Sequence, residues 1–277
     1  MNEVTATQDY WEQVATFAKT ASDEVGAQLM DAFGTASAEQ KADGSLVTKY
    51  DKWADQELRD RIAKAFPDHG VLTEEAEHTF PGTDWCWVID PIDGTTNFAR
   101  GVPLWGISLG LLYQGTPVFG HVYMPPIQQH FHGFFPGSSG LDMLTGAFAN
   151  GQTIHIGENC SSAPPSNTRL FSLCARSLKV LKNPFPCKIR MLGVATYNLL
   201  TVASSVCLGA VEATPKIWDI AAVWVITQAA GASWTDLSEE AAFPLKAGKD
   251  YSTHPFPTLV TRPDLVEKFE PLVKVIL

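Results

Sequence analysis

The sequence predicts a mixed fold, α+β in its first half and α/β in its second half. In the first half, two segments with apolar residues at helical spacing precede short apolar segments that alternate with turn pairs. Beyond residue 168, strand and helix patterns alternate along the chain. Residues 157–168 are rich in Ser, Pro and Asn, which favours a boundary there. We therefore expect an N-terminal α+β domain over residues 1–156 and a C-terminal α/β domain over residues 157–277.

The first helix is predicted over about residues 9–33, because apolar side chains recur there every three or four positions. Asp9 and Glu12 have the spacing of a capping pair at its start. Residues 34–45 are mostly small and polar, so they are predicted to form a mobile surface loop. Lys41, an early cation in that loop, is expected to be solvated.

A second helix is predicted over residues 48–66, where Asp51 heads an apolar face. An acid there can cap the helix, point into a site at the helix N-terminus, or do both. A short strand over residues 70–73 follows and ends in Glu74-Glu75. If it runs parallel to the next strand, Glu74 and the acid that ends that strand, Asp90, come together. Adjacent strand residues point to opposite faces, so only one of the two glutamates can face that acid.

The next strand, over residues 85–89, is apolar, partly β-branched and too short for a helix. It leads into Asp-Pro-Ile-Asp-Gly-Thr-Thr-Asn-Phe, residues 90–98. Pro91 cannot donate a ladder hydrogen bond, so the chain is expected to turn there. Gly94 lets the backbone approach a ligand closely, and Thr95 can open a helical turn whose free N–H groups bind an anion.

Asp90 and Asp93 therefore lie beside an anion-binding turn, where their own charges would repel the anion. A divalent metal removes this conflict, because the carboxylates bind the ion, and the ion and the N–H groups together bind a phosphate. The other interpretation is an Asp-Gly turn that only caps a helix. The length of the motif favours the metal and phosphate site.

The remaining elements are predicted from turn pairs and apolar periodicity. Hairpins are expected over residues 105–124 around Gln114-Gly115-Thr116 and over 147–156 around Asn150-Gly151, with another strand over 129–135. In the second half the expected strands cover residues 169–174, 187–192, 209–213, 232–236 and 258–261, and the expected helices cover 194–208 and 218–231. Asp219 opens the last of these helices, where it is either a simple cap or part of the site.

The bulk composition limits the classes of function. Lys and Arg number 20 against 30 Asp and Glu, a formal net charge of −10, which argues against a nucleic-acid-binding or acidic-membrane-binding surface. The 5 cysteines are widely spaced, with no Cys-x-x-Cys pair, which indicates free thiols in a reducing compartment such as the cytoplasm. No signal peptide is expected, and the longest apolar run, residues 194–211, contains too many polar residues for a membrane span.

These motifs resemble those of the inositol monophosphatase family, magnesium-dependent and lithium-sensitive phosphatases. Over nearly the whole chain, Glu74-Glu75, the residue 90–98 string and Trp218-Asp219-Ile220-Ala221-Ala222 match in the family's order and approximate spacing. The central string is highly specific and the other two are modestly so. The resemblance implies a layered αβαβα sandwich of the inositol monophosphatase and fructose-1,6-bisphosphatase type, with Mg²⁺ as cofactor and a homodimer as the expected assembly.

The resemblance also implies roles for individual residues. The metal ligands would be Glu74, Asp90, Asp93, Asp219 and the carbonyl of Ile92. Asp51, in the pattern Leu46-Val47-Thr48-Lys49-Tyr50-Asp51, would pair with Thr95 to orient the attacking water, with Glu74 as a further catalytic residue. The substrate would be bound by Asp93, Gly94, Thr95, Ala195 and Glu212, and Glu212 would contact its hydroxyl groups.

The implied function is Mg²⁺-dependent hydrolysis of a phosphate monoester, most directly inositol 1-phosphate, by in-line attack of a metal-activated water. Histidinol phosphate, fructose 1,6-bisphosphate, adenosine 3′,5′-bisphosphate and NADP are alternative substrates. The chain has Gly193-Val194-Ala195 where the family often has Gly-Ser-Ala, on the wall of the substrate pocket, so the alcohol stays open. A catalytically silent binding or regulatory protein is the alternative class. It would be expected to have lost a ligand carboxylate, and none is missing.

Overall fold

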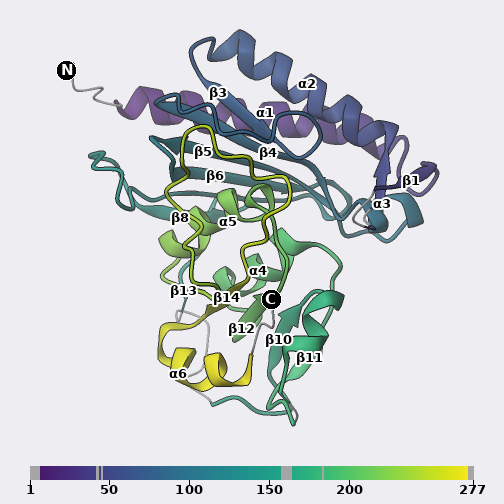
Figure 1. Ribbon diagram of the computed structural model, residues 1–277, viewed down its shortest axis with the longest axis vertical. Helices are drawn as coiled ribbons and strands as arrows, with labels where there is room; N and C mark the ends of the chain where they lie inside the picture. The colour runs from purple at the N-terminus through teal and green to yellow at the C-terminus, as the bar shows by residue number, and fades with distance from the viewer. Residues whose placement is uncertain (1–6, 42–43, 45, 157–163, 183, 274–277) are drawn as a thin grey trace.

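The computed structural model describes residues 7–41, 44, 46–156, 164–182 and 184–273. Its elements form five layers in the order helix, sheet, helix, sheet, helix (Figure 1). Helices α1 (Gln8–Met30) and α2 (Lys49–Ala65) cover the outer face of a seven-stranded sheet. Helices α4 (Ala195–Ala203) and α5 (Ile217–Ala229) lie between that sheet and a five-stranded sheet, and α6 (Val266–Phe269) packs beyond the second sheet. The prediction of a layered αβαβα sandwich is confirmed.

The seven-stranded sheet has the order β3-β4-β5-β6-β7-β8-β9. Strand β3 pairs parallel with β4, and every later pair is antiparallel. The strands are β3 (Gly70–Thr73), β4 (Trp85–Asp93), β5 (Gly106–Tyr113), β6 (Thr116–Met124), β7 (Gln129–Phe134), β8 (Gly146–Ala149) and β9 (Gln152–Thr153). The parallel pairing places the carboxyl ends of β3 and β4 at one edge of the sheet, so Glu74 and Asp90 follow neighbouring strand ends.

Both predicted hairpins are present. The turn between β5 and β6 has positive φ at Gln114 (47°) and Gly115 (83°), and the turn between β8 and β9 has it at Asn150 (47°) and Gly151 (76°). Positive φ at both central residues is the geometry of a type I′ turn, whose twist matches that of the flanking strands.

Strand β4 runs through Pro91 to Asp93, contrary to the expectation that the chain turns at Pro91. Its pairing with β5 shifts register between Asp90 and Asp93. Pro91 falls in this irregular step, where a missing N–H costs no regular ladder bond. The turn comes at Gly94, with φ of 90°, and α3 (Thr95–Arg100) begins directly after it.

The helix caps agree with the sequence analysis at one helix and differ at the other. The N-cap of α1 is Thr7, whose side chain accepts a hydrogen bond from a backbone N–H, so the predicted cap by Asp9 and Glu12 is wrong. Thr7, a short polar residue two positions before Asp9, caps the helix instead. In α2, Thr48 and Asp51 form a reciprocal capping box, which confirms the capping role expected for Asp51.

The segment predicted as a mobile loop over residues 34–45 contains a strand. Strand β1 (Ala38–Gln40) pairs antiparallel with β2 (Leu46–Thr48), and Lys41 follows β1 directly. The strand was not predicted because its three residues are all exposed and show no apolar alternation. Residues 42, 43 and 45 of the same segment lie outside the described part of the chain.

The five-stranded sheet has the order β11-β10-β12-β14-β13. Strand β10 is parallel to β11 and β12, and β14 is antiparallel to β12 and β13. The strands are β10 (Leu170–Leu173), β11 (Lys188–Arg190), β12 (Gly209–Glu212), β13 (Ser233–Asp236) and β14 (Thr258–Thr261), each within its predicted range. In the predicted boundary segment, residues 157–163 lie outside the described part of the chain.

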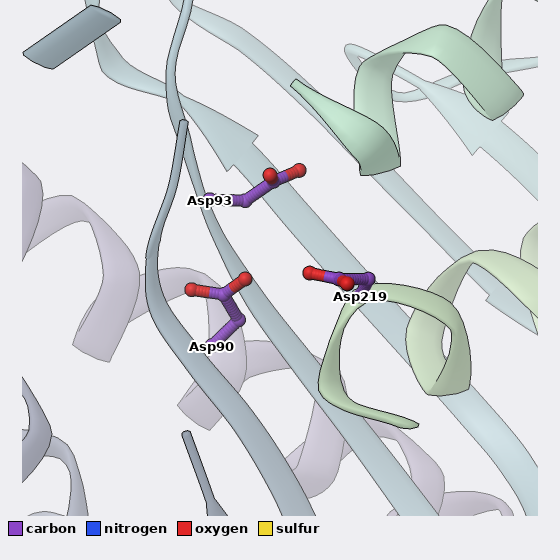
Figure 2. A group of neighbouring side chains, drawn as sticks. All are labelled: Asp90, Asp93 and Asp219. Carbon is purple, nitrogen blue, oxygen red and sulfur yellow. The ribbon is translucent and has the colours of Figure 1, made fainter. Parts of the chain in front are cut away.

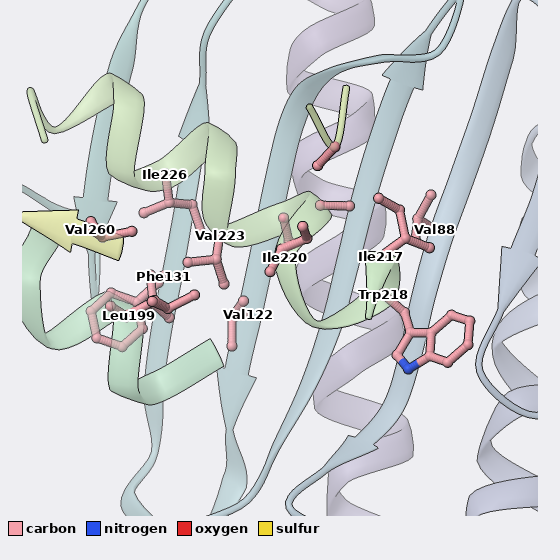
Figure 3. Packing of buried hydrophobic residues seen from close by; sticks show 14 of the residues in the cluster. Val88, Val122, Phe131, Leu199, Ile217, Trp218, Ile220, Val223, Ile226 and Val260 are labelled. Atoms are coloured by element: carbon pink, nitrogen blue, oxygen red, sulfur yellow. The ribbon is translucent and has the colours of Figure 1, made fainter. Parts of the chain in front are cut away.

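Helix α5 packs unusually close to the first sheet. Gly110, Gly120 and Gly133 are neighbours in register across β5, β6 and β7, and together form what we call the glycine row. A Cβ at Gly120 would lie 2.1 Å from the carbonyl oxygen of Ala222, and a Cβ at Gly133 would lie 3.0 Å from Ile226 Cα. The apolar side chains of α5 fill the space between the two sheets (Figure 3). The absence of side chains in the glycine row thus sets the height of α5 above the sheet.

Two expectations from composition can be compared with the described residues. Cys86, Cys174, Cys187 and Cys207 are free thiols, and Cys160 lies outside the described part of the chain. No helix among the described residues is long and apolar enough to cross a lipid bilayer.

Candidate metal centre

Three carboxylates from two distant segments gather between the first sheet and α5. Asp90 and Asp93 come from the end of β4, and Asp219 comes from the first turn of α5 (Figure 2). Each offers an oxygen, and these oxygens all lie within 4.8 Å of one another. Asp90 is 1% exposed and Asp93 is 7% exposed, so bulk water screens their charges poorly. The sequence analysis expected these residues to meet, and the fold brings them together.

Asp219 combines two roles that the sequence left as alternatives. Its Oδ2 accepts a hydrogen bond from the Lys216 N–H at 2.6 Å, which completes a capping box at the start of α5. The same carboxyl belongs to the three-acid cluster. The cap fixes the carboxyl at the helix N-terminus, where the helix dipole favours negative charge.

The cluster is electrostatically strained. Burial raises the pKa of Asp90 well above its usual range, and the charges of Glu74, Asp93 and Asp219 raise it further. Burial, and then the charges of Asp93 and Glu74, also raise the pKa of Asp219. Burial raises the pKa of Asp93, although three hydrogen bonds from Ala195 and Thr196 oppose the rise. A cation among these groups would relieve both the repulsion and the desolvation.

The donor set fits a hard divalent cation. All three side chains offer carboxylate oxygens, the ligands that Mg²⁺ and Ca²⁺ prefer, and the cluster contains neither the sulfur nor the imidazole donors typical of zinc and copper sites. The oxygens are close enough together to contact one ion. We therefore regard the cluster as able to hold Mg²⁺.

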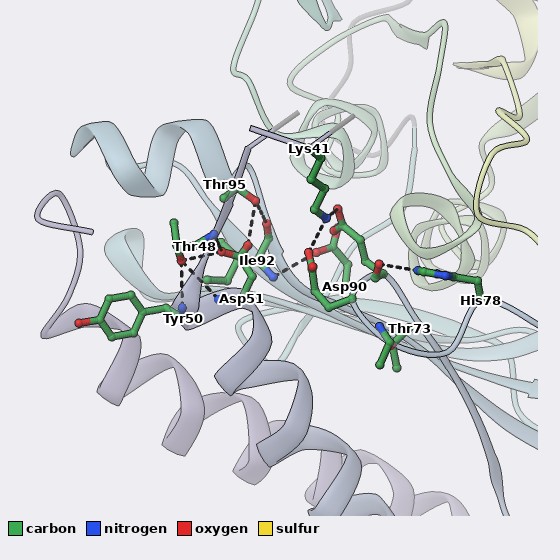
Figure 4. Close-up of polar contacts among 12 residues, drawn as sticks. Lys41, Thr48, Tyr50, Asp51, Thr73, His78, Asp90, Ile92 and Thr95 are labelled. Carbon is green, nitrogen blue, oxygen red and sulfur yellow. Dashed lines mark hydrogen bonds and ion pairs between the residues drawn. The ribbon is translucent and has the colours of Figure 1, made fainter. Parts of the chain in front are cut away.

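Glu74 approaches this centre from the end of β3. Its backbone N–H donates to the Ile89 carbonyl at 3.1 Å, which continues the β3–β4 pairing by one residue. The Lys41 Nζ contacts Glu74 Oε1 at 2.9 Å and Glu75 Oε1 at 2.6 Å (Figure 4). The expectation that Lys41 is solvated is therefore wrong, because its position at the end of β1 brings it to the two acids that follow β3. Glu74 lies outside the group of three acids, and Lys41 is its direct counter-ion.

Burial raises the pKa of Glu74 to about 7, against the opposing effect of Lys41. Burial also raises the pKa of Glu75. In return, the charge of Glu74 and hydrogen bonds to both acids raise the pKa of Lys41, although burial lowers it. Lys41 therefore stays charged at neutral pH and occupies the position of a counter-ion beside the acids.

Asp51 and Thr95, predicted to act together, are in contact. The Thr95 Oγ1 donates to Asp51 Oδ1 at 2.9 Å and also lies 3.1 Å from the Ile92 carbonyl oxygen (Figure 4). Asp51 Oδ2 accepts from the N–H and the hydroxyl of Thr48 at 2.7 and 2.6 Å. Asp51 is fully buried, and this burial raises its pKa while the three donors lower it. Its orientation is thus fixed by the helix cap on one side and by Thr95 on the other.

Gly94 begins the turn for which the sequence analysis predicted anion binding. Its φ of 90° lies in the left-handed region, which favours glycine. A Cβ there would lie 3.0 Å from Val194 Cγ2 and 3.2 Å from the Gly193 carbonyl oxygen. Any other residue would therefore strain the turn and push the β4 end away from the segment that precedes α4.

Ala195, expected on the substrate wall, contacts the cluster through its backbone. Its N–H donates to Asp93 Oδ1 at 3.1 Å. The next residue, Thr196, donates to Asp93 Oδ2 from its N–H at 2.7 Å and from its hydroxyl at 2.5 Å. Asp93, the last residue of β4, therefore caps the N-terminus of α4.

Glu212, the predicted contact for substrate hydroxyls, ends β12 and is 2% exposed. Its Oε1 accepts from Asn198 Nδ2 at 2.7 Å, and Asn198 Oδ1 accepts from the Ser172 hydroxyl at 2.6 Å. Burial raises the pKa of Glu212 well above its usual range, and Cys174 raises it further. The side chain is thus held by α4 and approaches the same region as Asp93, whose charge acts on it.

The sequence analysis missed Lys41, Thr196 and Asn198 as contacts of the site acids. Thr196 and Asn198 interrupt the apolar run at residues 194–211, near the start of the predicted helix. Two polar residues in that position could have indicated contacts with the site acids. Lys41 gave no signal, because its partners lie more than 30 residues away in the sequence and depend on a strand that was not predicted.

A sequence profile described as the inositol monophosphatase family matches residues 10–264. The chain belongs to the inositol monophosphatase family. It is 32% identical to an Aquifex aeolicus fructose-1,6-bisphosphatase/inositol-1-monophosphatase, over 80% of this chain and 85% of that protein. It is 30% identical to a Chlorobaculum parvum histidinol-phosphatase, over 76% of this chain and 80% of that protein. The solved Thermotoga maritima IMPase superimposes with a TM-score of 0.75 at 27% identity, covering 93% of this chain and 95% of that one.

Members of the inositol monophosphatase family are metal-dependent phosphatases, which agrees with the acid cluster described above. The named relatives differ in substrate, since one carries a fructose bisphosphatase and inositol monophosphatase name and another a histidinol-phosphatase name. Family membership therefore establishes the reaction class and leaves the alcohol open.

Replacing Lys41 by methionine is expected to tighten Mg²⁺ binding about threefold to tenfold, because the ammonium group no longer competes with a metal for Glu74. Titration calorimetry of the metal-free protein measures this change. The matched control is Lys19→Met, which removes the same charge from the exposed Lys19–Asp23 pair on α1 and should leave the affinity unchanged. Weaker Mg²⁺ binding by Lys41→Met would show that Lys41 supports the site instead of competing with the metal.

Proposed function

We propose that the chain hydrolyses phosphate monoesters of small polyols, with inositol 1-phosphate as the preferred substrate and Mg²⁺ as the cofactor. The observation that carries this proposal is the meeting of Asp90, Asp93 and Asp219 within 4.8 Å in a family of phosphatases. Two buried acids and one half-buried acid, all with raised pKa values and close together, are poorly explained by stability alone.

In the proposed site, Asp90, Asp93, Asp219 and Glu74 hold the metal, together with the carbonyl oxygen of Ile92. Bound Mg²⁺ would supply charge neutralisation at the phosphoryl oxygens and make a nearby water more acidic. The Ile92 carbonyl oxygen lies 3.1 Å from Thr95 Oγ1, so it is next to the Asp51 and Thr95 pair. To bind the metal, Glu74 would have to release its contact with the Lys41 ammonium group.

The Thr95 and Asp51 pair can orient a water molecule. Because the Thr95 hydroxyl hydrogen points to Asp51 Oδ1, the lone pairs of Thr95 Oγ1 are free to accept a hydrogen from water. A water held in this way would direct a lone pair of its oxygen away from Thr95, toward the phosphorus atom of a bound substrate. Glu74 would accept the proton that such a water loses.

The substrate would be held at both of its ends. The N–H groups of Gly94 and Thr95 at the start of α3 would bind phosphate oxygens. At the other end, Glu212 would accept hydrogen bonds from hydroxyl groups of the alcohol, next to Ala195. The raised pKa of Glu212 agrees with a carboxyl that is shielded from water, for which the hydroxyl groups of a substrate would supply further hydrogen bonds.

Phosphate release from a substrate panel tests this proposal, with Mg²⁺ and again with EDTA. The panel contains inositol 1-phosphate, histidinol phosphate, fructose 1,6-bisphosphate, adenosine 3′,5′-bisphosphate and NADP. We expect Mg²⁺-dependent hydrolysis with the highest kcat/KM for inositol 1-phosphate. Preference for another substrate would keep the metal site and overturn the polyol assignment. No release from any substrate would favour a catalytically silent binding protein.

Replacing Glu212 by glutamine tests the polyol contact. The KM for inositol 1-phosphate is expected to rise about tenfold or more, because a hydrogen bond to a charged group contributes about 1.5–3 kcal/mol. Hydrolysis of 4-nitrophenyl phosphate, which has no alcohol hydroxyls, should change little, and it serves as the internal control. Equal losses on both substrates would show that Glu212 acts on the fold or the metal instead.

We also propose a homodimer in a reducing compartment, the cytoplasm. The four described cysteines are free thiols, which supports the compartment. Light scattering after size-exclusion chromatography measures the assembly state, and a monomer would overturn the dimer.

A further inference from the structure

Helix α4 donates hydrogen bonds to two carboxyls of the proposed site, Asp93 on the metal side and Glu212 on the substrate side. Two of its residues, Thr196 and Asn198, are completely buried, and each donates to one acid from a different sheet. Thr196 bonds Asp93 at the end of β4, and Asn198 bonds Glu212 at the end of β12. A buried threonine at the second position of a helix has an ordinary alternative partner, a carbonyl of its own chain. Here its hydroxyl is directed to the carboxylate.

The hydrogen bonds on Asp93 determine which of its oxygens is available. A carboxylate oxygen has two lone pairs, and Oδ2 accepts both the N–H and the hydroxyl of Thr196, at 2.7 and 2.5 Å. Oδ1 accepts one bond, from the Ala195 N–H at 3.1 Å, and keeps one lone pair. The Asp93 carboxylate therefore keeps a single free lone pair, on Oδ1, for a further partner.

We propose that Thr196 is a positioning residue that fixes Asp93 as a ligand through Oδ1 alone. Its hydroxyl occupies Oδ2, which prevents the carboxyl from rotating and keeps that oxygen from binding a substrate hydroxyl. Recognition of the alcohol then falls to Glu212, and Asp93 serves the metal. The inference rests on the proposed function, because it assigns Asp93 to a Mg²⁺ site.

The backbone N–H groups of Ala195 and Thr196 alone would not achieve this. They leave one lone pair on each oxygen, so either oxygen could bind the cation or a hydroxyl group. The Thr196 hydroxyl breaks this symmetry. Partners of metal-binding groups that orient them in this way typically change metal affinity about 10- to 100-fold when removed.

The test compares Mg²⁺ affinities by titration calorimetry of the full-length protein. Thr196→Val keeps the side-chain shape and removes the hydroxyl, and it is expected to weaken Mg²⁺ binding about 10- to 100-fold. Thr196→Ser retains the hydroxyl and should restore binding to within about threefold of the unsubstituted protein. The Mg²⁺ requirement for phosphate release should shift in parallel, with most of kcat recovered at saturating Mg²⁺. A purely structural loss would not produce this separation.

Thr201→Val is the matched control. It removes a buried threonine hydroxyl from the same helix, but that hydroxyl donates to the Asn198 carbonyl at 2.6 Å and not to an acid of the site. Equal weakening by Thr201→Val, failure of Thr196→Ser to restore affinity, or an unchanged affinity in Thr196→Val would each overturn the inference. If Thr196→Val does not fold, Thr196→Ala is used in the same comparison.

The two proposals fail in different ways. An unsubstituted protein that binds Mg²⁺ but hydrolyses no phosphate monoester would refute the proposed function. The effect of Thr196 on metal affinity could then still be confirmed. An active enzyme whose Mg²⁺ affinity is the same with and without the Thr196 hydroxyl would refute only the role of Thr196. Absence of Mg²⁺ binding by the unsubstituted protein would overturn both.

Discussion

Replacing Asp90 by asparagine is expected to lower kcat/KM by more than about a hundredfold and to make the metal-free protein more stable. Removing a residue that only orients a metal ligand typically lowers activity about 10- to 100-fold. Removing an oxygen that itself binds the metal should lower the activity more. The stability rises because Asp90 is 1% exposed, and burial followed by the charges of Glu74, Asp93 and Asp219 raises its pKa. A neutral amide of the same shape avoids most of this cost.

Thermal unfolding in EDTA measures the stability, and phosphate release with Mg²⁺ measures the activity. The unfolding midpoint should rise by about 2 °C or more, since about 1 kcal/mol corresponds to about 2–4 °C in a chain of this size. The control is Asp55→Asn, another buried acid, 1% exposed, but paired with Arg59 at 2.8 Å. That substitution should destabilise the protein and leave hydrolysis intact. An active Asp90→Asn protein would disprove the metal assignment.

The contribution of Glu74 to the stability of the metal-free protein is expected to fall as the pH rises from about 4.5 to about 7. Burial raises the pKa of Glu74 from 4.5 to about 7, so between these values the folded state holds a proton that the unfolded chain has released. Stability falls with pH wherever the folded state binds more protons. For Glu74 alone the full loss above pH 7 is on the order of 3 kcal/mol. Asp90 and Asp219, whose pKa values are also raised, act in the same direction.

Urea unfolding at about pH 5 and about pH 8 in EDTA checks this trend. Burial lowers the pKa values of His69, His121, His130 and His132, so these side chains add stability as the pH rises over the same interval. The test therefore compares the unsubstituted protein with Glu74→Gln, in which the histidines are the same. Mg²⁺ should reverse the trend, because it binds the deprotonated acids, which are more abundant at the higher pH. In EDTA, the stability of Glu74→Gln relative to the unsubstituted protein should increase between these two pH values, because only the unsubstituted protein loses the Glu74 proton. A stability difference that does not change with pH would contradict the charge assignment.

The sequence could predict the acids that follow strand ends, because strand periodicity and turn chemistry are local. Glu74 and Asp90 were expected together if their strands were parallel, and β3 and β4 do pair in parallel. The pairing of Asp51 with Thr95 could not come from periodicity, since 44 residues separate them, and it was inferred from the family resemblance.

What the sequence could not show depends on irregular backbone and on distant contacts. Pro91 was expected to end β4, but a shift in register lets the strand continue to Asp93, and no local signal reports that shift. Lys41 was assigned to solvent because its environment is created by β1, a strand of three exposed residues. Thr196 was seen only as a polar interruption, because its role depends on Asp93, 103 residues away.

The glycine row has a consequence for how the sequence can vary. Gly110, Gly120 and Gly133 contact no acid of the site, yet they determine how near α5 comes to the sheet. Because α5 carries Asp219 while β4 carries Asp90, a methyl group at Gly120, 2.1 Å from a carbonyl oxygen of α5, would separate the acids. Three positions that bear no side chain thus act as a spacer for the three-acid cluster. Divergence at these strand positions would be limited by catalysis as well as by packing.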